Sequence, residues 1–218
     1  MSDSARQVAL SAAMERMAPP GIRLGCRLIR EGDEALLLPE EAAALRARRP
    51  AARRASGAAR ALARHLLKNE GMAGAIIGRS ATGAPLWPPG VVGSLAHDDE
   101  MAVAAIARVA DVPSVGIDVE PADPLPDDIA ALVFHDGDAV GGVEPMLSGR
   151  ALFSAKEAVY KAVHPLAGEI LGYEHIRVDF PRGRATTTTG HAMRLFFSLR
   201  PRVVVLAVST EDQPSSIL

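Results

Sequence analysis

Near its centre the chain reads Val115-Gly116-Ile117-Asp118-Val119-Glu120. The alternation of small and branched apolar residues predicts a buried strand, and two carboxylates interrupt it. Alternate residues of a strand share a face, so Asp118 and Glu120 are expected to point the same way. A buried carboxylate requires a hydrogen-bonding partner or a cation. This stretch therefore predicts a pair of acids presented together from a rigid element.

A second stretch reads Phe153-Ser154-Ala155-Lys156-Glu157-Ala158-Val159-Tyr160-Lys161 and predicts a helix. Glu157 and Lys161 are four residues apart, which puts them on one face, one turn from each other. The ordinary alternative is a surface ion pair worth about 0.2–0.5 kcal/mol. The apolar residues between these charges argue against a surface ion pair, because they indicate that the helix has a buried face. Three carboxylates and an ammonium on two rigid elements suit a hard divalent cation beside a phosphate ester.

Composition and charge narrow the class of protein. The chain has 218 residues, is 48% hydrophobic, and carries a formal net charge of −2. This balance argues against a nucleic-acid-binding protein. No apolar run approaches the roughly 20 residues that span a bilayer, and the N-terminus does not resemble a signal peptide. The single cysteine, Cys26, fits a reducing compartment, so we expect a cytoplasmic protein without a membrane partner.

The order of predicted elements indicates an α+β fold, because strands and helices are mixed without strict alternation. Pro165 is expected to stop the helix that carries the second stretch. Helices are predicted over residues 4–17, from 39 to Pro50, and over 51–68, 126–134 and 144–163. Strands are predicted over residues 22–29, 91–95, 101–109, 114–119, 173–180, 192–199 and 203–209.

Basic residues upstream could bind an anion. Arg53, Arg60 and Arg64 recur at helical spacing and fall on one face, where a solvated surface is the ordinary explanation. The planar fork of arginine nevertheless suits phosphate oxygens. His97 ends a predicted strand after the turn Trp87-Pro88-Pro89-Gly90, and strand ends are where ligand-contacting residues gather.

Taken in order, these motifs resemble those of the 4′-phosphopantetheinyl transferases. The match is to the monomeric surfactin- and enterobactin-type branch, not to the short trimeric holo-carrier-protein synthases. The resemblance is carried by Trp87–His97, Val115–Glu120 and Phe153–Ala162, with Arg53, Arg60 and Arg64 upstream at similar spacing.

The resemblance implies two similar α/β lobes related by a pseudo-twofold, with the active site in the cleft between them. Residues 1–112 would form the lobe that contacts the phosphates and adenine of coenzyme A. Residues 113–218 would form the lobe that binds magnesium and carries the catalytic groups. We therefore expect a monomer with both lobes in one chain.

The implied reaction moves the 4′-phosphopantetheine arm of coenzyme A to a serine hydroxyl of an apo acyl or peptidyl carrier protein, and it releases adenosine 3′,5′-bisphosphate. Asp118, Glu120 and Glu157 would hold Mg²⁺, with Mn²⁺ as an alternative, and two or all three would contact it directly. Glu157 would act as general base and Lys161 would neutralise pyrophosphate charge, with Asp118 completing the catalytic group. The coenzyme A contacts implied are Arg53, Arg60, Arg79, His97, Lys156 and Lys161.

The sequence departs from the family pattern at several positions. Ala96 and Asp98 stand where hydroxyl or thiol residues are common, and Thr82 replaces a basic residue. Arg53 lacks the basic neighbour often found before it. These departures concern the coenzyme A contacts rather than the carboxylates. Trp87 would either shape the adenine side or belong to the core.

Two rival functions remain open at this stage. One is a non-catalytic coenzyme A or nucleotide-binding relative, and the other is a Mg²⁺-dependent nucleotide phosphohydrolase. The acceptor could belong to fatty-acid, polyketide, nonribosomal peptide or siderophore biosynthesis. The segment 126–144 is a candidate surface for docking the carrier protein.

Overall fold

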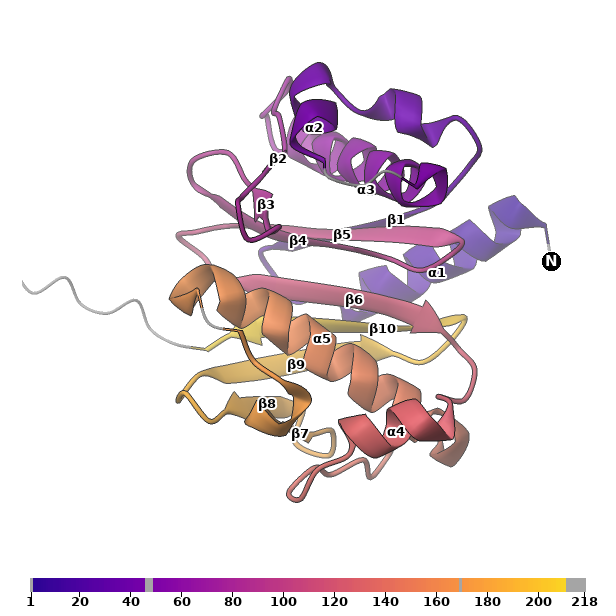
Figure 1. Ribbon diagram of the computed structural model, residues 1–218, viewed down its shortest axis with the longest axis vertical. Helices are drawn as coiled ribbons and strands as arrows, with labels where there is room; N and C mark the ends of the chain where they lie inside the picture. Colours follow the sequence, from indigo (N-terminus) through magenta and orange to yellow (C-terminus); the bar gives the residue numbers. More distant parts are fainter. Residues whose placement is uncertain (1, 46–48, 169, 211–218) are drawn as a thin grey trace, which may run out of the picture.

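The first half of the chain builds a small antiparallel sheet covered by one long helix. The computed structural model describes residues 2–45, 49–168 and 170–210. Its first sheet has the order β1-β5-β4, and α3 lies across it (Figure 1). The elements of this half are α1 (Asp3–Met17), β1 (Ile22–Leu28), η1 (Asp33–Leu36), α2 (Pro39–Ala44), α3 (Pro50–Asn69), β2 (Gly78–Arg79), β3 (Pro85–Leu86), β4 (Val91–His97) and β5 (Met101–Arg108).

The second half also contains an antiparallel sheet crossed by a long helix. Its sheet has the order β6-β10-β9-β8-β7, and α5 covers one face (Figure 1). The elements are β6 (Val115–Pro121), α4 (Asp127–Val133), η2 (Pro145–Leu147), α5 (Ser148–Ala167), η3 (Tyr173–His175), β7 (Ile176–Asp179), β8 (Arg184–Thr187), β9 (Ala192–Ser198) and β10 (Arg202–Ser209).

The two halves share a hydrophobic core. Leu10 and Met14 of α1 pack with residues of β1 and β5, such as Ile22 and Val103, and with Ile117 of β6. β4 also lies beside β6, although the two belong to different sheets. Removing this shared apolar surface from water ties the halves together. The division at residues 112 and 113 falls between β5 and β6, and the pseudo-twofold stays a prediction.

The mixed α/β character with antiparallel sheets is confirmed, and several details differ from expectation. The helix expected from 39 to Pro50 ends at Ala44, and Pro50 begins α3 instead of ending a helix. Pro165 does not stop α5, which continues to Ala167 and ends at Gly168 with φ of 67°. The proline sits in the last turn, where it removes one backbone donor without ending the helix at once. The strand expected over 173–180 begins with η3, and β8 was missed because its Thr-rich sequence lacks apolar alternation. No helix within the described ranges is long and apolar enough to cross a membrane.

α5 approaches β6 unusually closely at Gly116. A Cβ built at this glycine would lie 1.9 Å from the main-chain oxygen of Ala158 and 2.7 Å from the nitrogen of Ala162. Both distances are shorter than any van der Waals contact, so only glycine permits this approach. The contact fixes the height of α5 over the strand that carries the carboxylates.

Replacing Gly116 by alanine should therefore destabilise the protein, by about 3 kcal/mol, because neither helix backbone nor strand can yield locally. Urea denaturation of the variant measures this loss. The matched control is Gly78→Ala, where the nearest atoms to the new Cβ would be Leu86 side-chain carbons at 3.6 Å. Equal stability of Gly116→Ala and the wild-type chain would show that α5 does not depend on this approach.

Candidate functional site

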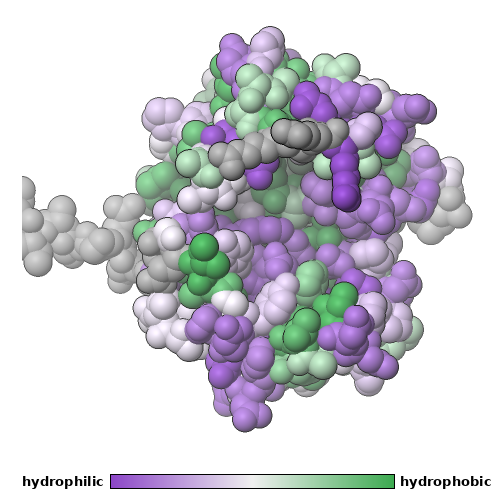
Figure 2. Space-filling model, in the orientation of Figure 1, coloured by the Kyte–Doolittle hydropathy of each residue, from purple (hydrophilic) through white to green (hydrophobic). Residues whose placement is uncertain are grey.

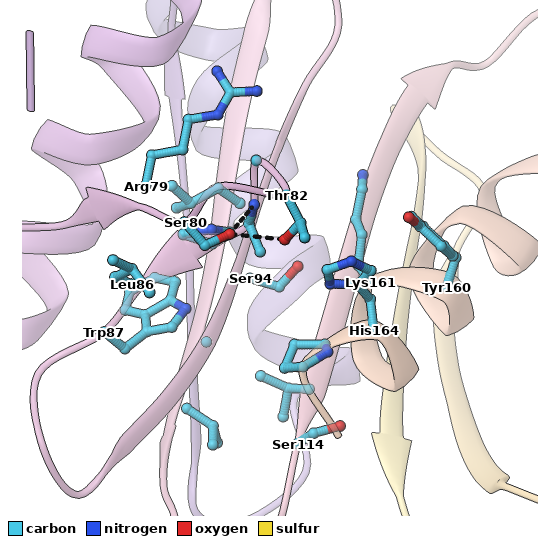
Figure 3. A pocket seen from close by; sticks show the side chains of 18 of the residues that line it. Arg79, Ser80, Thr82, Leu86, Trp87, Ser94, Ser114, Tyr160, Lys161 and His164 are labelled. Atoms are coloured by element: carbon cyan, nitrogen blue, oxygen red, sulfur yellow. Dashed lines mark hydrogen bonds between the residues drawn. The ribbon is translucent and has the colours of Figure 1, made fainter. Parts of the chain in front are cut away.

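A cavity of about 700 Å³ lies where the two halves meet. Arg79 and Trp87 line it from the first half, whereas Lys161 and His164 line it from α5 of the second (Figure 3). Figure 2 shows that this face of the molecule is largely hydrophilic between the upper and lower halves. A smaller cavity of about 390 Å³ is lined by Glu157 and Leu171 among others, and Tyr160 lines both cavities. The combination offers room for an extended, charged ligand beside the acidic residues.

Asp118 is buried on β6 and paired with Lys161 of α5. The Lys161 Nζ donates to Asp118 Oδ1 at 2.6 Å, and it lies 3.4 Å from the main-chain oxygen of Ile117. The other oxygen, Asp118 Oδ2, is buried and has no hydrogen bond of normal geometry within the described residues, although the Ser154 hydroxyl is close enough to lower the pKa of Asp118. Burial raises the pKa of Asp118, the Lys161 charge opposes this effect, and the Glu157 charge adds to it. The site thus contains one carboxylate oxygen that still requires a partner.

Glu120 is held by Arg150, a residue that the sequence motifs did not single out. Arg150 Nη1 donates to Glu120 Oε2 at 2.8 Å. The same guanidinium donates to the main-chain oxygens of Asp123 at 3.2 Å and Pro124 at 3.0 Å. Burial raises the pKa of Glu120 to about 7, with the Asp118 charge as the next cause and Arg150 opposing. Glu120 is therefore poised near neutral pH by its crowded acidic surroundings.

Glu157 is engaged by Tyr173, which sequence reasoning also missed. The Tyr173 hydroxyl donates to Glu157 Oε1 at 2.9 Å. Burial and this hydrogen bond to a carboxylate raise the pKa of Tyr173 well above its usual range. The partners lie 16 residues apart on different elements, so no local spacing signals the contact.

The three carboxylates do not form a ready-made metal cluster. Within residues 2–45, 49–168 and 170–210, no three His, Cys, Asp or Glu side chains are grouped to hold a metal ion. Asp118, Glu120 and Glu157 each face a different donor in this structure, so their role in holding a metal stays a prediction. Their oxygen chemistry still fits magnesium, which takes one or two protein carboxylates and keeps several waters. The unpartnered Asp118 Oδ2 is the oxygen best suited to it.

Lys156 occupies a different position from the one expected. Its side chain has no exposed surface, and its Nζ donates to Val133 O at 2.8 Å, Asp138 Oδ2 at 2.7 Å and Tyr173 O at 3.0 Å. All three donors of the ammonium are thus used inside the protein. Lys156 has no donor left for phosphate, so it is not available as a coenzyme A contact.

Among the arginines that the structure describes, Arg79 alone lines the large cavity. Arg60 is buried on α3, and its Nε donates to the main-chain oxygen of Ile77 at 3.0 Å, next to β2. Burial lowers the pKa of Arg60; the Glu41 charge opposes this shift, and the charges of Arg79 and Arg64 add to it.

The other two arginines of the stripe differ in their contacts. Arg64 is committed to the buried carboxylate of Glu41. The Arg53 side chain makes no hydrogen bond or ion pair within the described part of the chain, although its main-chain nitrogen donates to Arg49 O at 3.1 Å. The predicted arginine stripe therefore divides into structural and available members.

His97 approaches the acidic group from the first half. It stands at the exposed end of β4, beyond Ser94 and Leu95, which line the large cavity. Desolvation by the surrounding protein lowers the pKa of His97; Asp98 opposes this shift and the Lys161 charge adds to it.

The departures from the family pattern each have a local role. Asp98 forms a partly buried ion pair with Arg202 of β10, the neighbour of the strand carrying Glu120. Ala96 belongs to the shared core, and the Thr82 hydroxyl lies 2.8 Å from that of Ser80 in the turn beside the cavity.

Comparison with known proteins gives a consistent result. A model of the 4′-phosphopantetheinyl transferase N-terminal domain matches residues 40–107, and a model of the 4′-phosphopantetheinyl transferase superfamily matches residues 114–209. The transferase Svp of Streptomyces mobaraensis is 39% identical over 159 residues, which are 70% of this chain and 65% of the relative. The transferase Npt of Nocardia iowensis is 39% identical over 137 residues, or 61% of this chain and 62% of the relative.

A third relative, the transferase PptT of Mycobacterium tuberculosis, is 38% identical over 148 residues, which are 66% of this chain and 65% of the relative. The matches therefore cover a little less than two thirds of the length of each of these proteins.

The raised pKa of Glu120 predicts that the free energy of unfolding changes with pH. A carboxyl whose pKa rises from 4.5 to about 7 on folding favours the folded state most at low pH, and this contribution is lost as pH rises through 7. Between pH 4.5 and pH 8, the free energy of unfolding of Glu120→Gln should therefore rise by about 1–3 kcal/mol relative to that of the wild-type chain. Urea denaturation at several pH values, with a chelator present, measures the difference.

The control is Glu144→Gln, whose pair with Arg200 is exposed on both sides and should contribute little at any pH. If the difference in unfolding free energy between Glu120→Gln and the wild-type chain does not change with pH, the pKa of Glu120 is not raised on folding.

Proposed function

We propose, since the chain belongs to the 4′-phosphopantetheinyl transferase superfamily, that it transfers the phosphopantetheine arm of coenzyme A to a serine of a carrier protein. The observation that carries the proposal is the Asp118–Lys161 pair at the edge of the large cavity. An ammonium there, next to a carboxylate oxygen without a protein partner, suits a pyrophosphate and its counter-cation.

The basic residues on the first-half side suit the phosphates of coenzyme A. Arg79 lines the cavity, Arg60 lies behind it against Ile77, and His97 ends the neighbouring strand. Together with Arg53 they would bind the 3′-phosphate and nearby phosphate oxygens. Trp87 would contribute an aromatic wall on this side of the cavity.

The chemistry proposed is an in-line displacement at the β-phosphorus of coenzyme A. The serine oxygen of the carrier forms the new bond to phosphorus, and the bond to the bridging oxygen breaks. That oxygen leaves with the bond's electron pair as part of adenosine 3′,5′-bisphosphate. Glu157 accepts the serine proton, and Lys161 neutralises charge on the pyrophosphate.

Magnesium held by Asp118, with Glu157 or Glu120 beside it, would supply further neutralisation of the phosphate oxygens. Glu157 therefore has two roles in the proposal, one toward the cation and one toward the serine proton. Two or all three of these carboxylates would contact the ion directly.

The partner proposed is an acyl or peptidyl carrier protein, met by a monomer in the cytoplasm. Exposed apolar side chains of and beside α4, such as Leu132 and Phe134, lie near the small cavity and offer a docking surface. This surface falls within the segment 126–144 expected to dock the carrier.

Incubation with coenzyme A, Mg²⁺ and an apo carrier protein tests the proposal by mass spectrometry. A carrier that gains one phosphopantetheine supports transfer. Cleavage of coenzyme A without carrier modification supports a phosphohydrolase, and binding without turnover supports a non-catalytic relative. Either of the last two results overturns the proposal.

Removing the acidic groups should abolish transfer. Asp118→Ala deletes the carboxylate of the Lys161 pair, and Glu157→Gln deletes the base while keeping its shape. Each should lower kcat at least about 100-fold. Glu34→Gln, an exposed acid on η1, serves as control and should transfer normally. Near-normal turnover in either site variant would be incompatible with the assigned roles.

The phosphate contacts can be tested with a truncated donor. If Arg60, Arg79 and His97 bind the 3′-phosphate, alanine variants should raise KM for coenzyme A about tenfold each and change KM for 3′-dephospho-coenzyme A little. Equal losses with both donors would instead assign these residues to the pyrophosphate or to folding.

A further inference from the structure

Tyr173 touches the proposed base although it lies outside every motif. Its hydroxyl donates to Glu157 Oε1 at 2.9 Å, while Oε2 of the same carboxylate accepts no hydrogen bond from the residues that the structure describes. A phenol at neutral pH is protonated and can fill this donor role. One oxygen of Glu157 is thus occupied and the other is open.

The position of Tyr173 is fixed from two directions. Its main-chain oxygen accepts a hydrogen bond from the buried Lys156 Nζ at 3.0 Å, and its ring lies 5.8 Å from that of Phe153, tilted by 59°. Lys156 is on α5, one residue before Glu157. The helix that carries the base therefore also holds the residue that donates to it.

Lys156 is in turn anchored by Asp138. Asp138 Oδ2 accepts from Lys156 Nζ at 2.7 Å and Oδ1 accepts from the main-chain nitrogen of Val178 on β7 at 3.0 Å. Neither side chain of the pair is more than 1% exposed. Breaking a satisfied buried ion pair of this kind is costly, because loss of either partner leaves an uncompensated charge. The pair therefore keeps its geometry. It ties α5, the loop before α5 and β7 into one unit.

We propose that Tyr173 is a positioning residue for Glu157 and that the Lys156–Asp138 pair holds Tyr173 in place. The inference rests on the proposed function. By occupying Oε1, the hydroxyl fixes the plane of the carboxylate and leaves Oε2 directed to the serine proton or to the cation. An unrestrained glutamate would spend much of its time in other rotamers, and misplacement of a reacting group by about 1 Å can cost 100-fold in rate.

The test is Tyr173→Phe, which keeps the ring on Phe153 and removes only the hydroxyl. We expect kcat for transfer to fall about tenfold, with KM for coenzyme A within twofold and the melting temperature within a few degrees of wild type. A residue that only ties η3 to α5 would instead change stability without this split between kcat and KM.

A matched control lies in the same turn. His175 Nδ1 accepts from the main-chain nitrogen of Gly172 at 3.0 Å, and within the part of the chain described His175 makes no hydrogen bond or ion pair with Glu157. His175→Ala should transfer at the wild-type rate. A tenfold loss in this variant too would show that order of the turn, rather than the hydroxyl, is what matters, and would overturn the inference.

A double-mutant cycle separates direct from indirect action. In a Glu157→Gln background, Tyr173→Phe should leave the residual rate unchanged, because the group it positions is already gone. Additive losses would overturn the inference. Undiminished transfer by the single variant would overturn it and leave the proposed function standing, whereas no transfer by the wild-type chain would overturn both.

Discussion

The close approach of α5 to β6 at Gly116 is the constraint on which the site depends. Ala158 and Ala162 touch the glycine through their main-chain atoms. Glu157 and Lys161 each precede one of these alanines, so the contact that sets the helix height also sets the two functional side chains at its edge. Asp118 lies two residues along the strand from the glycine, within reach of Lys161. A larger residue at position 116 would lift the helix and separate the charges.

This geometry brings three carboxylates together where they are partly shielded from water. The protein compensates their charges to different extents. Lys161 compensates one oxygen of Asp118, Arg150 compensates Glu120, and a neutral hydroxyl contacts Glu157. The pKa of Asp118 and that of Glu120 are nevertheless raised, which means that the protein donors do not fully offset burial and mutual repulsion. Such a site favours an added cation, because burying charge without full compensation is costly.

Sequence patterns predicted the main strands and long helices, because periodicity reports which face is buried. They failed where a partner is distant: Tyr173 and Arg150 lie on other elements from the carboxylates they contact, and no spacing connects them. Lys156 is different, since a signal was present. It lies four residues after Leu152 and three before Val159, both fully buried, so helical geometry already placed it on the core side of α5. Its charge suggested a ligand-binding role, but its place on the buried side of α5 keeps it inside the protein.

The basic side chains proposed to bind phosphate and the carboxylates lie on different halves, so contacts between the halves must fix their separation. The shared apolar core does this only coarsely, because apolar contacts are non-directional. The ion pair between Asp98 and Arg202 adds direction: it joins the residue after His97 to the strand paired with the one that carries Glu120. Asp98 is one of the residues that depart from the family pattern. Its pairing with Arg202 ties the end of β4, next to His97, to the second half by a charged contact.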